Sequence, residues 1–131
     1  MKEPRWVPRV VVDSIHLDQL REHGGLPGVR DENALEAALA RARQKWHYEP
    51  AADLASLAAA YGFGWARAHA FSDGNKRTAF VTMMTFLGLN AKDLSATELE
   101  VVEMMVSLAG GELTESALAG WIRARLIRFT L

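Results

Sequence analysis

The segment from Ala51 to about Ala68 constrains the fold most, because its alanine content predicts a helix. Alanine has the highest helix propensity of all residues. Apolar side chains of the segment also recur at the spacing of one helix face. These residues are Leu54, Leu57, Ala58, Tyr61 and Trp65. We therefore expect a helix with one apolar face over this segment.

The rest of the chain shows further helical segments, separated by short polar or glycine-rich breaks. Each begins near a residue that can accept a hydrogen bond from the first backbone N–H groups of a helix. Thr97 and Glu100 have the spacing of a capping box, and Gly24 and Gly25 end the first segment. The expected start signals are Asp13 or Ser14, Asp31, Asn75, Thr97, and Thr114 or Ser116.

Two stretches lack a clear helical pattern. Residues 6–12 contain a run of three valines and could form a strand or an extended lead-in. From Gln44 to Pro50 the helical periodicity lapses, which predicts a loop or a small ribbon. We expect one all-α domain over residues 1–131, a compact bundle of about six helices with room for a short β ribbon.

The composition excludes several classes of function. The chain has no cysteine, which removes thiol nucleophiles, thiolate zinc sites, iron–sulfur clusters and disulfide scaffolds. Its 15 Lys and Arg residues balance 16 Asp and Glu. We therefore expect no direct binding of nucleic acid, whose affinity comes from many phosphate-neutralising cations. No apolar run approaches the roughly 20 residues that span a bilayer, and the N-terminus lacks the apolar core of a signal peptide. We expect a cytoplasmic protein that does not contact membranes.

One stretch between two expected helices carries residue types that are useful in phosphate chemistry. A helix that begins near Asn75 would present unpaired backbone N–H groups and a partial positive charge, which together form an anion site. Lys76 and Arg77 oppose that helix dipole, which indicates that an anion binds there. The stretch reads His69-Ala70-Phe71-Ser72-Asp73-Gly74-Asn75-Lys76-Arg77-Thr78.

The side chains of this stretch suit separate chemical roles. Histidine as a residue type changes charge near neutral pH, so His69 can accept a proton from an attacking hydroxyl group. Asp73 offers a hard oxygen ligand for Mg²⁺, which typically takes one or two carboxylates together with phosphate oxygens. Gly74 lets the backbone approach a phosphate, and Asn75 can cap the helix or point its amide at an anion. Arg77 offers a bidentate fork for phosphate.

Each of these residues also has an ordinary structural explanation. A lone His in a helical protein is more often a surface or a satisfied residue, Asp-Gly-Asn is usually a turn, and Lys-Arg is usually a solvated pair. Their succession in a loop that leads into a helix makes the functional interpretation the stronger one. Phe71 is expected to turn inward and to fix the loop to the core.

The stretch His69-x-Phe71-x-Asp73-Gly74-Asn75-Lys76-Arg77 resembles the signature of the Fic/Doc family, which has the general form H-x-F-x-[DE]-[GA]-N-[GK]-R. The resemblance extends from about Val10 to the C-terminus. Other segments resemble the Doc branch of the family, the toxins of Phd–Doc modules. These segments are residues 23–32, residues 35–39 and Ala66-Arg67. The expected bundle agrees with that family's compact helical core.

Two positions decide which reaction the resemblance implies. Members of the family that transfer an adenylyl group usually carry Gly after the Asn and a second Arg three residues beyond the first. This chain has Lys76 and Phe80 at these positions, and both departures match the Doc branch, in which the γ-phosphate meets the hydroxyl nucleophile. The resemblance therefore implies a protein kinase with ATP as co-substrate and Mg²⁺ as cofactor. Its implied target is a threonine of elongation factor Tu, and the outcome is arrest of translation.

The resemblance also implies roles for single residues. His69 would be the catalytic base and Asp73 the Mg²⁺ ligand. Arg67, where the Doc branch also has Arg, either contacts the nucleotide or closes the end of its helix. The implied phosphate-binding residues are Gly74, Asn75, Lys76 and Arg77.

Residues 44–50 match the position of the family's flap, an edge that can hold a target segment by strand addition. Trp46 and Tyr48 would then either contact the target or, in the case of Trp46, pack on the core.

Regulation and two alternatives complete the interpretation. We find no inhibitory [ST]-x-x-x-E-[GN] string, so inhibition is expected in trans, by a Phd-like antitoxin. One alternative is a nucleotidylyltransferase that moves AMP to a protein hydroxyl group. The other is a regulatory Fic-like module without catalytic activity.

Overall fold

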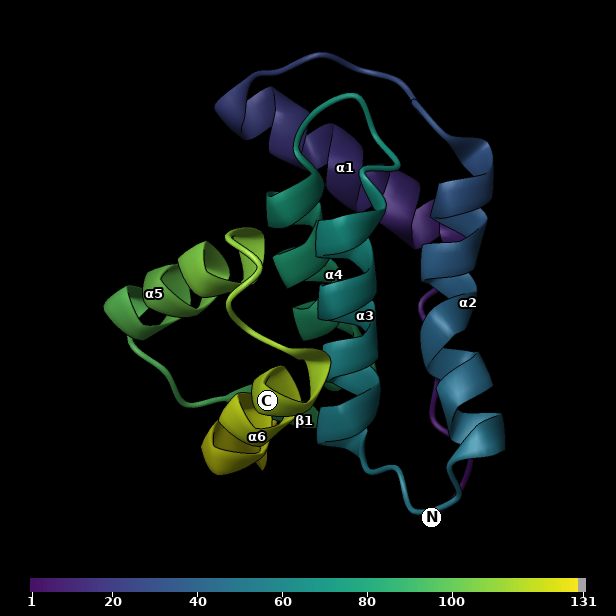
Figure 1. Ribbon diagram of the computed structural model, residues 1–131, viewed down its shortest axis with the longest axis vertical. Helices are drawn as coiled ribbons and strands as arrows, with labels where there is room; N and C mark the ends of the chain where they lie inside the picture. Colours follow the sequence, from purple (N-terminus) through teal and green to yellow (C-terminus); the bar gives the residue numbers. More distant parts are fainter. Residues whose placement is uncertain (130–131) are drawn as a thin grey trace.

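The computed structural model describes residues 1–129, which form six helices and one two-stranded antiparallel sheet (Figure 1). The predicted all-α bundle with a short β ribbon is therefore confirmed. The elements are α1 (Arg9–His23), α2 (Glu32–Tyr48), α3 (Leu54–Ala68), α4 (Asn75–Leu89), β1 (Lys92–Leu94), α5 (Glu98–Ala109), α6 (Glu115–Arg125) and β2 (Leu126–Arg128).

Helix α3 lies at the centre of the molecule and packs against α2, α4 and α6 (Figure 1). Its alanines are small enough to let these neighbours approach closely, and Leu57, Tyr61 and Trp65 fill the spaces between them. The side chains of all three are fully buried. The predicted Ala-rich helix is confirmed, although it begins at Leu54 rather than at Ala51, because Asp53 caps it by accepting a hydrogen bond from Ser56 N (2.9 Å).

Three other predicted helix starts are confirmed by side-chain caps. Asp31 Oδ1 accepts a hydrogen bond from Ala34 N (3.0 Å) at the start of α2. Thr97 and Glu100 form the predicted capping box of α5. Thr114, rather than Ser116, caps α6. Each cap satisfies a backbone N–H group that has no partner within its helix.

The expected strand within residues 6–12 is wrong. Helix α1 begins at Arg9, so the run of valines belongs to its first turn, and neither Asp13 nor Ser14 is its cap. Pro8 occupies the N-cap position with φ −72°. Its fixed φ and missing N–H group suit the start of a helix, and the burial of Val12 in the core outweighs the β propensity of the run.

The expected loop or ribbon over residues 44–50 is also wrong, because α2 continues to Tyr48. The last turn is held by tertiary contacts: the Trp46 ring packs edge-on against Trp6 (6.2 Å between centroids), and Lys45 forms ion pairs with Glu49 (3.0 Å) and Glu115 (3.2 Å). The ribbon of this fold is instead β1 paired with β2, where Asp93 lies opposite Ile127. Among the described residues, no helix is long and apolar enough to cross a membrane.

Candidate active site at the junction of α3 and α4

The loop between α3 and α4 is bounded by two residues with left-handed backbone conformations. His69 (φ 49°, ψ 41°) ends α3, and Gly74 (φ 75°, ψ 16°) precedes the first residue of α4. Glycine adopts this conformation without steric cost, and His is among the residues that tolerate it. The two turns hold His69, which is exposed, and the start of α4 in fixed positions on either side of the loop.

Phe71 fixes the loop to the core, as predicted. Its ring is buried and stacks between the rings of His16 (centroids 3.7 Å apart) and Trp65 (5.6 Å). His16 Nε2 also lies 2.8 Å from the main-chain oxygen of Asp73. A carbonyl oxygen can only accept, so this nitrogen donates and carries a proton. Helix α1 therefore supports the loop through both the ring and the nitrogen of His16.

Asn75 closes the loop instead of capping α4. Its Oδ1 accepts a hydrogen bond from Phe71 N (2.9 Å), and its Nδ2 donates to Phe71 O (2.9 Å). The N-cap residue is Gly74, so the predicted capping role of Asn75 is wrong. Both polar atoms of its amide bond to the loop, so at this position the backbone N–H group is the one that remains available to an anion.

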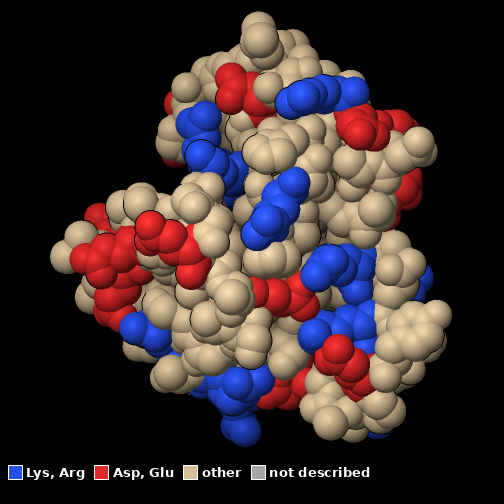
Figure 2. All heavy atoms as spheres, viewed as in Figure 1, with Lys and Arg blue, Asp and Glu red and all other residues tan. Residues whose placement is uncertain are grey.

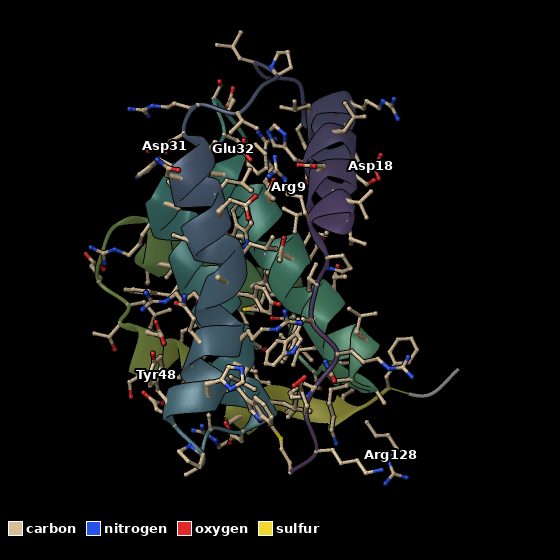
Figure 3. The ribbon with its side chains drawn as sticks, turned by 90° about the vertical axis from the view of Figure 1, so that its right-hand side faces the viewer. Arg9, Asp18, Asp31, Glu32, Tyr48 and Arg128 are labelled. Atoms are coloured by element: carbon tan, nitrogen blue, oxygen red, sulfur yellow. The ribbon has the colours of Figure 1, made fainter. Side chains whose placement is uncertain are left out.

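A second segment runs alongside the loop. Val29 and Phe71 form an antiparallel β-bridge, flanked by hydrogen bonds from Arg30 N to Ala70 O (2.8 Å) and from Ser72 N to Gly28 O (3.1 Å). The extended pairing next to the motif is thus made by residues 28–30 and not by residues 44–50. Trp46 and Tyr48 lie in the last turn of α2, and the rise of a helix places Tyr48 about 24 Å along the axis from Glu32. Figure 3 shows Tyr48 and Glu32 at opposite ends of this helix.

A cavity of about 400 Å³ opens between the loop, the start of α4 and the segment before α2. It brings together the predicted residues His69, Asp73, Lys76 and Arg77, together with Gly74 and Asn75. Arg30, which lies outside the sequence motif, also lines it. The complete lining is Arg30, Ala66, His69, Ser72, Asp73, Gly74, Asn75, Lys76 and Arg77.

The charges of the cavity are unbalanced. Arg30, Lys76 and Arg77 face one carboxylate, that of Asp73. Lys76 and Arg77 belong to the first turn of α4, where the helix dipole is also positive. Figure 2 shows Lys and Arg side chains, with Asp and Glu side chains among them, in the upper part of the face where Figure 1 places the loop between α3 and α4. The cavity is therefore suited to an anion.

The Asp73 carboxylate fits a role in holding Mg²⁺. Its Oδ1 accepts a hydrogen bond from Gly74 N (2.8 Å) and its Oδ2 one from Leu26 N (3.4 Å), while the side chain remains exposed. Within residues 1–129 no group of three or more His, Cys, Asp or Glu side chains could hold a metal ion without other ligands. Mg²⁺ would thus depend on phosphate oxygens and water in addition to Asp73, which is its usual coordination at nucleotide sites.

Arg67 lies outside this cavity. Its guanidinium lies over the ring of Phe63 (5.0 Å) and lines a neighbouring depression together with Arg41, between α2 and α3. The structure therefore places Arg67 apart from Lys76 and Arg77, and a contact between Arg67 and the nucleotide stays a prediction.

Comparison with known proteins identifies the class to which this fold and loop belong. A model of the Fic/DOC family matches residues 6–87, which is more than half of the chain, and the protein belongs to this family. Two relatives indicate the branch. The chain is 34% identical over 110 residues to the protein kinase doc of Escherichia phage P1, covering 84% of this chain and 86% of the relative. It is 42% identical over 74 residues to the toxin Doc of Mycolicibacterium smegmatis, covering 56% of this chain and 57% of the relative. Both names agree with the Doc branch.

Proposed function

We propose that this protein is the toxin of a toxin–antitoxin module and a kinase that transfers the γ-phosphate of ATP to a hydroxyl group of a protein. The observation that carries the proposal is the cavity in which His69 lies beside the cationic first turn of α4 and a single carboxylate. The names of the two relatives, a protein kinase and a toxin, support it.

The residues of the cavity would share the work of phosphoryl transfer. His69 accepts the proton of the target hydroxyl group as its oxygen forms a bond to the γ-phosphorus, and the bond from that phosphorus to the bridging oxygen breaks, releasing ADP. Lys76, Arg77 and the N–H groups of the first turn of α4 stabilise the charge that develops on the phosphate oxygens. Mg²⁺ held by Asp73 and phosphate oxygens would neutralise part of the same charge.

We further propose a threonine of elongation factor Tu as the acceptor, with arrest of translation as the result. The support for this step is membership of the Doc branch.

The antitoxin that restrains the protein is proposed to be Phd-like and to dock between α4 and α5. A groove of about 460 Å³ lies there, and Val102 and Val106 on its α5 side are 56% and 66% exposed. Figure 2 shows the notch between α5 and the upper part of the molecule, with basic side chains at its upper edge. Lys76 and Arg77 line the groove as well as the cavity. A segment bound in the groove would therefore also cover these two cations.

The test is the intact mass of elongation factor Tu after incubation with the protein, ATP and Mg²⁺. We expect the mass of one phosphate to be added, and no addition by a His69→Asn variant. Addition of a nucleotide instead would establish the nucleotidylyltransferase alternative. Two negative results together would favour the non-catalytic module. The wild-type protein would modify none of the candidate targets, and it would not arrest translation in a cell extract.

A further inference from the structure

We propose that Arg30 is a third cationic ligand for the phosphate groups of the nucleotide, acting with Lys76 and Arg77; this inference rests on the proposed function. Arg30 is outside the motif and is separated from it by about forty residues of chain. It enters the site through the fold alone, because it lines the same cavity as His69, Lys76 and Arg77.

The backbone of Arg30 is fixed on both sides. Before it, Val29 pairs with Phe71. Its own N–H group and that of Asp31 both donate to Ala70 O (2.8 and 3.1 Å), and Asp31 then caps α2. The backbone of Arg30 is thus hydrogen-bonded to Ala70, the residue between His69 and Phe71. The backbone at Arg30 is therefore already ordered before a ligand binds, and only the side chain has to be ordered by binding.

The acidic residues nearest to Arg30 in sequence are already engaged. The Asp31 carboxylate accepts the capping hydrogen bond from Ala34 N. Arg9 of α1 binds Glu32 (2.5 Å) and Glu36 (2.7 Å), and Figure 3 shows Arg9 beside Asp31 and Glu32 at the start of α2. Within residues 1–129, no carboxylate lies within ion-pairing distance of the Arg30 guanidinium. Arg9 therefore leaves Arg30 available to an external anion.

The charge count supports a metal-bound triphosphate as that anion. The three cations of the cavity exceed its one carboxylate by two charges. ATP retains two negative charges when Mg²⁺ is bound, so the complex would neutralise the cavity. Without Arg30 one negative charge would be left unmatched. The planar guanidinium also offers two parallel donors to one phosphate group.

The experiment compares the binding of MgATP and of adenosine to the purified full chain by titration calorimetry. A charge-assisted hydrogen bond is worth about 1.5–3 kcal/mol, so we expect Arg30→Ala to weaken MgATP binding about ten- to a hundredfold. Adenosine, which has no phosphate, should bind wild type and variant equally. Arg30→Lys keeps the positive charge but lacks the two parallel donors of the guanidinium. Its affinity for MgATP should lie between those of wild type and Arg30→Ala.

The matched control is Arg21→Ala. Arg21 carries the same charge in the last turn of α1, is exposed, and does not line the cavity. It should leave MgATP affinity within about twofold of wild type, because an exposed distant charge is screened. The inference is overturned if Arg30→Ala binds MgATP like wild type, or if it loses adenosine and MgATP affinity equally. Dependence of MgATP binding on Arg30 in a protein that transfers no phosphate would uphold the inference and overturn the proposed kinase.

Discussion

Basic residues are used in opposite ways in two regions of this molecule. Around α6, almost every cation has a carboxylate partner: the pairs are Arg41–Glu115, Lys45–Glu115, Arg123–Asp53 and Arg125–Glu100. At the junction of α3 and α4, the cations of the cavity have none among the described residues. These are Arg30, Lys76 and Arg77.

The net charge of the chain is only −1, but its cations fall into two groups. The paired cations have a structural role, and the unpaired cations are candidates for binding a ligand. The ion pairs around α6 join segments that are distant in sequence, so stabilising the fold is a sufficient explanation for them. The cations of the cavity repel one another, and two of them lie at the positive end of α4. Such an arrangement is expected to lower the stability of the free protein, and the binding of an anion would relieve the repulsion.

The largest effect is expected at His69. We expect His69→Asn to lower the rate of phosphate transfer about 10²- to 10⁴-fold, the usual contribution of a general base, and to leave the melting temperature close to that of wild type. Asn is the matched substitution because, like His, it tolerates the left-handed conformation that His69 adopts (φ 49°). In His69→Ala, by contrast, about 1–2 kcal/mol of backbone strain would be added to the loss of the imidazole. A transfer rate within tenfold of wild type in His69→Asn would remove this residue from the mechanism.

A smaller effect is expected at Gly25, which lies in the loop after α1, next to the side chain of Asp73. A Cβ atom at Gly25 would lie 2.8 Å from Oδ2 of Asp73, whereas one at Gly24 would meet nothing within 4 Å. Both glycines have positive φ (124° and 76°). Alanine should therefore strain the backbone at either position, but only Gly25→Ala should also displace the carboxylate.

We expect Gly25→Ala to slow phosphate transfer about tenfold more than Gly24→Ala, since a displacement of about 1 Å in a catalytic group can cost up to 10²-fold in rate. It should also raise the Mg²⁺ concentration needed for half-maximal rate. The measurement is a Mg²⁺ titration of the transfer rate, alongside the melting temperatures of both variants. Equal losses in the two variants, with an unchanged Mg²⁺ requirement, would show that Gly25 serves the backbone only.

These contrasts also show what the sequence could predict. The residues from His69 to Arg77 are contiguous, so their chemical roles could be predicted from the sequence alone. Gly25 and His16 lie beside Asp73 although 48 and 57 positions of chain separate them from it, and the packing of α1 against α4 brings them there. Arg30 was missed for the same reason.

The helices were predictable where their signals are local. Capping side chains such as Asp31 and Thr97 act within one turn, and they marked helix starts correctly. The last turn of α2 was missed because it is held by Trp6 and Glu115, which lie far away in sequence. The first turn of α1 was missed because the burial of Val12 overrides a run of β-branched residues. Local patterns failed wherever distant contacts decide the conformation.

The smallest effect is expected in the paired region, at Asp53. The Arg123 guanidinium, 2.7 Å from Oδ2, lowers the pKa of Asp53 well below its ordinary value of 3.8. Asp53→Asn removes the charge but keeps the cap of α3, because Asn is as good an N-cap residue as Asp. The pair is about half-exposed, so we expect the free energy of unfolding at pH 7 to fall by only about 0.5 kcal/mol.

The pH dependence of that difference identifies the charge as its cause. A carboxylate whose pKa is depressed in the folded state stabilises the protein above its unfolded pKa, and this contribution is lost as the pH falls through the folded pKa. The difference between wild type and Asp53→Asn should therefore be constant above about pH 5 and should shrink between pH 5 and pH 2, as measured by urea denaturation. Phosphate transfer should not change, because Asp53 and His69 lie at opposite ends of α3. A difference that kept its full pH 7 size at pH 2 would assign the stabilisation to the cap rather than to the ion pair. A loss of transfer activity in Asp53→Asn would show that the paired region and the cavity are coupled, and the separation between structural and ligand-binding cations would then fail.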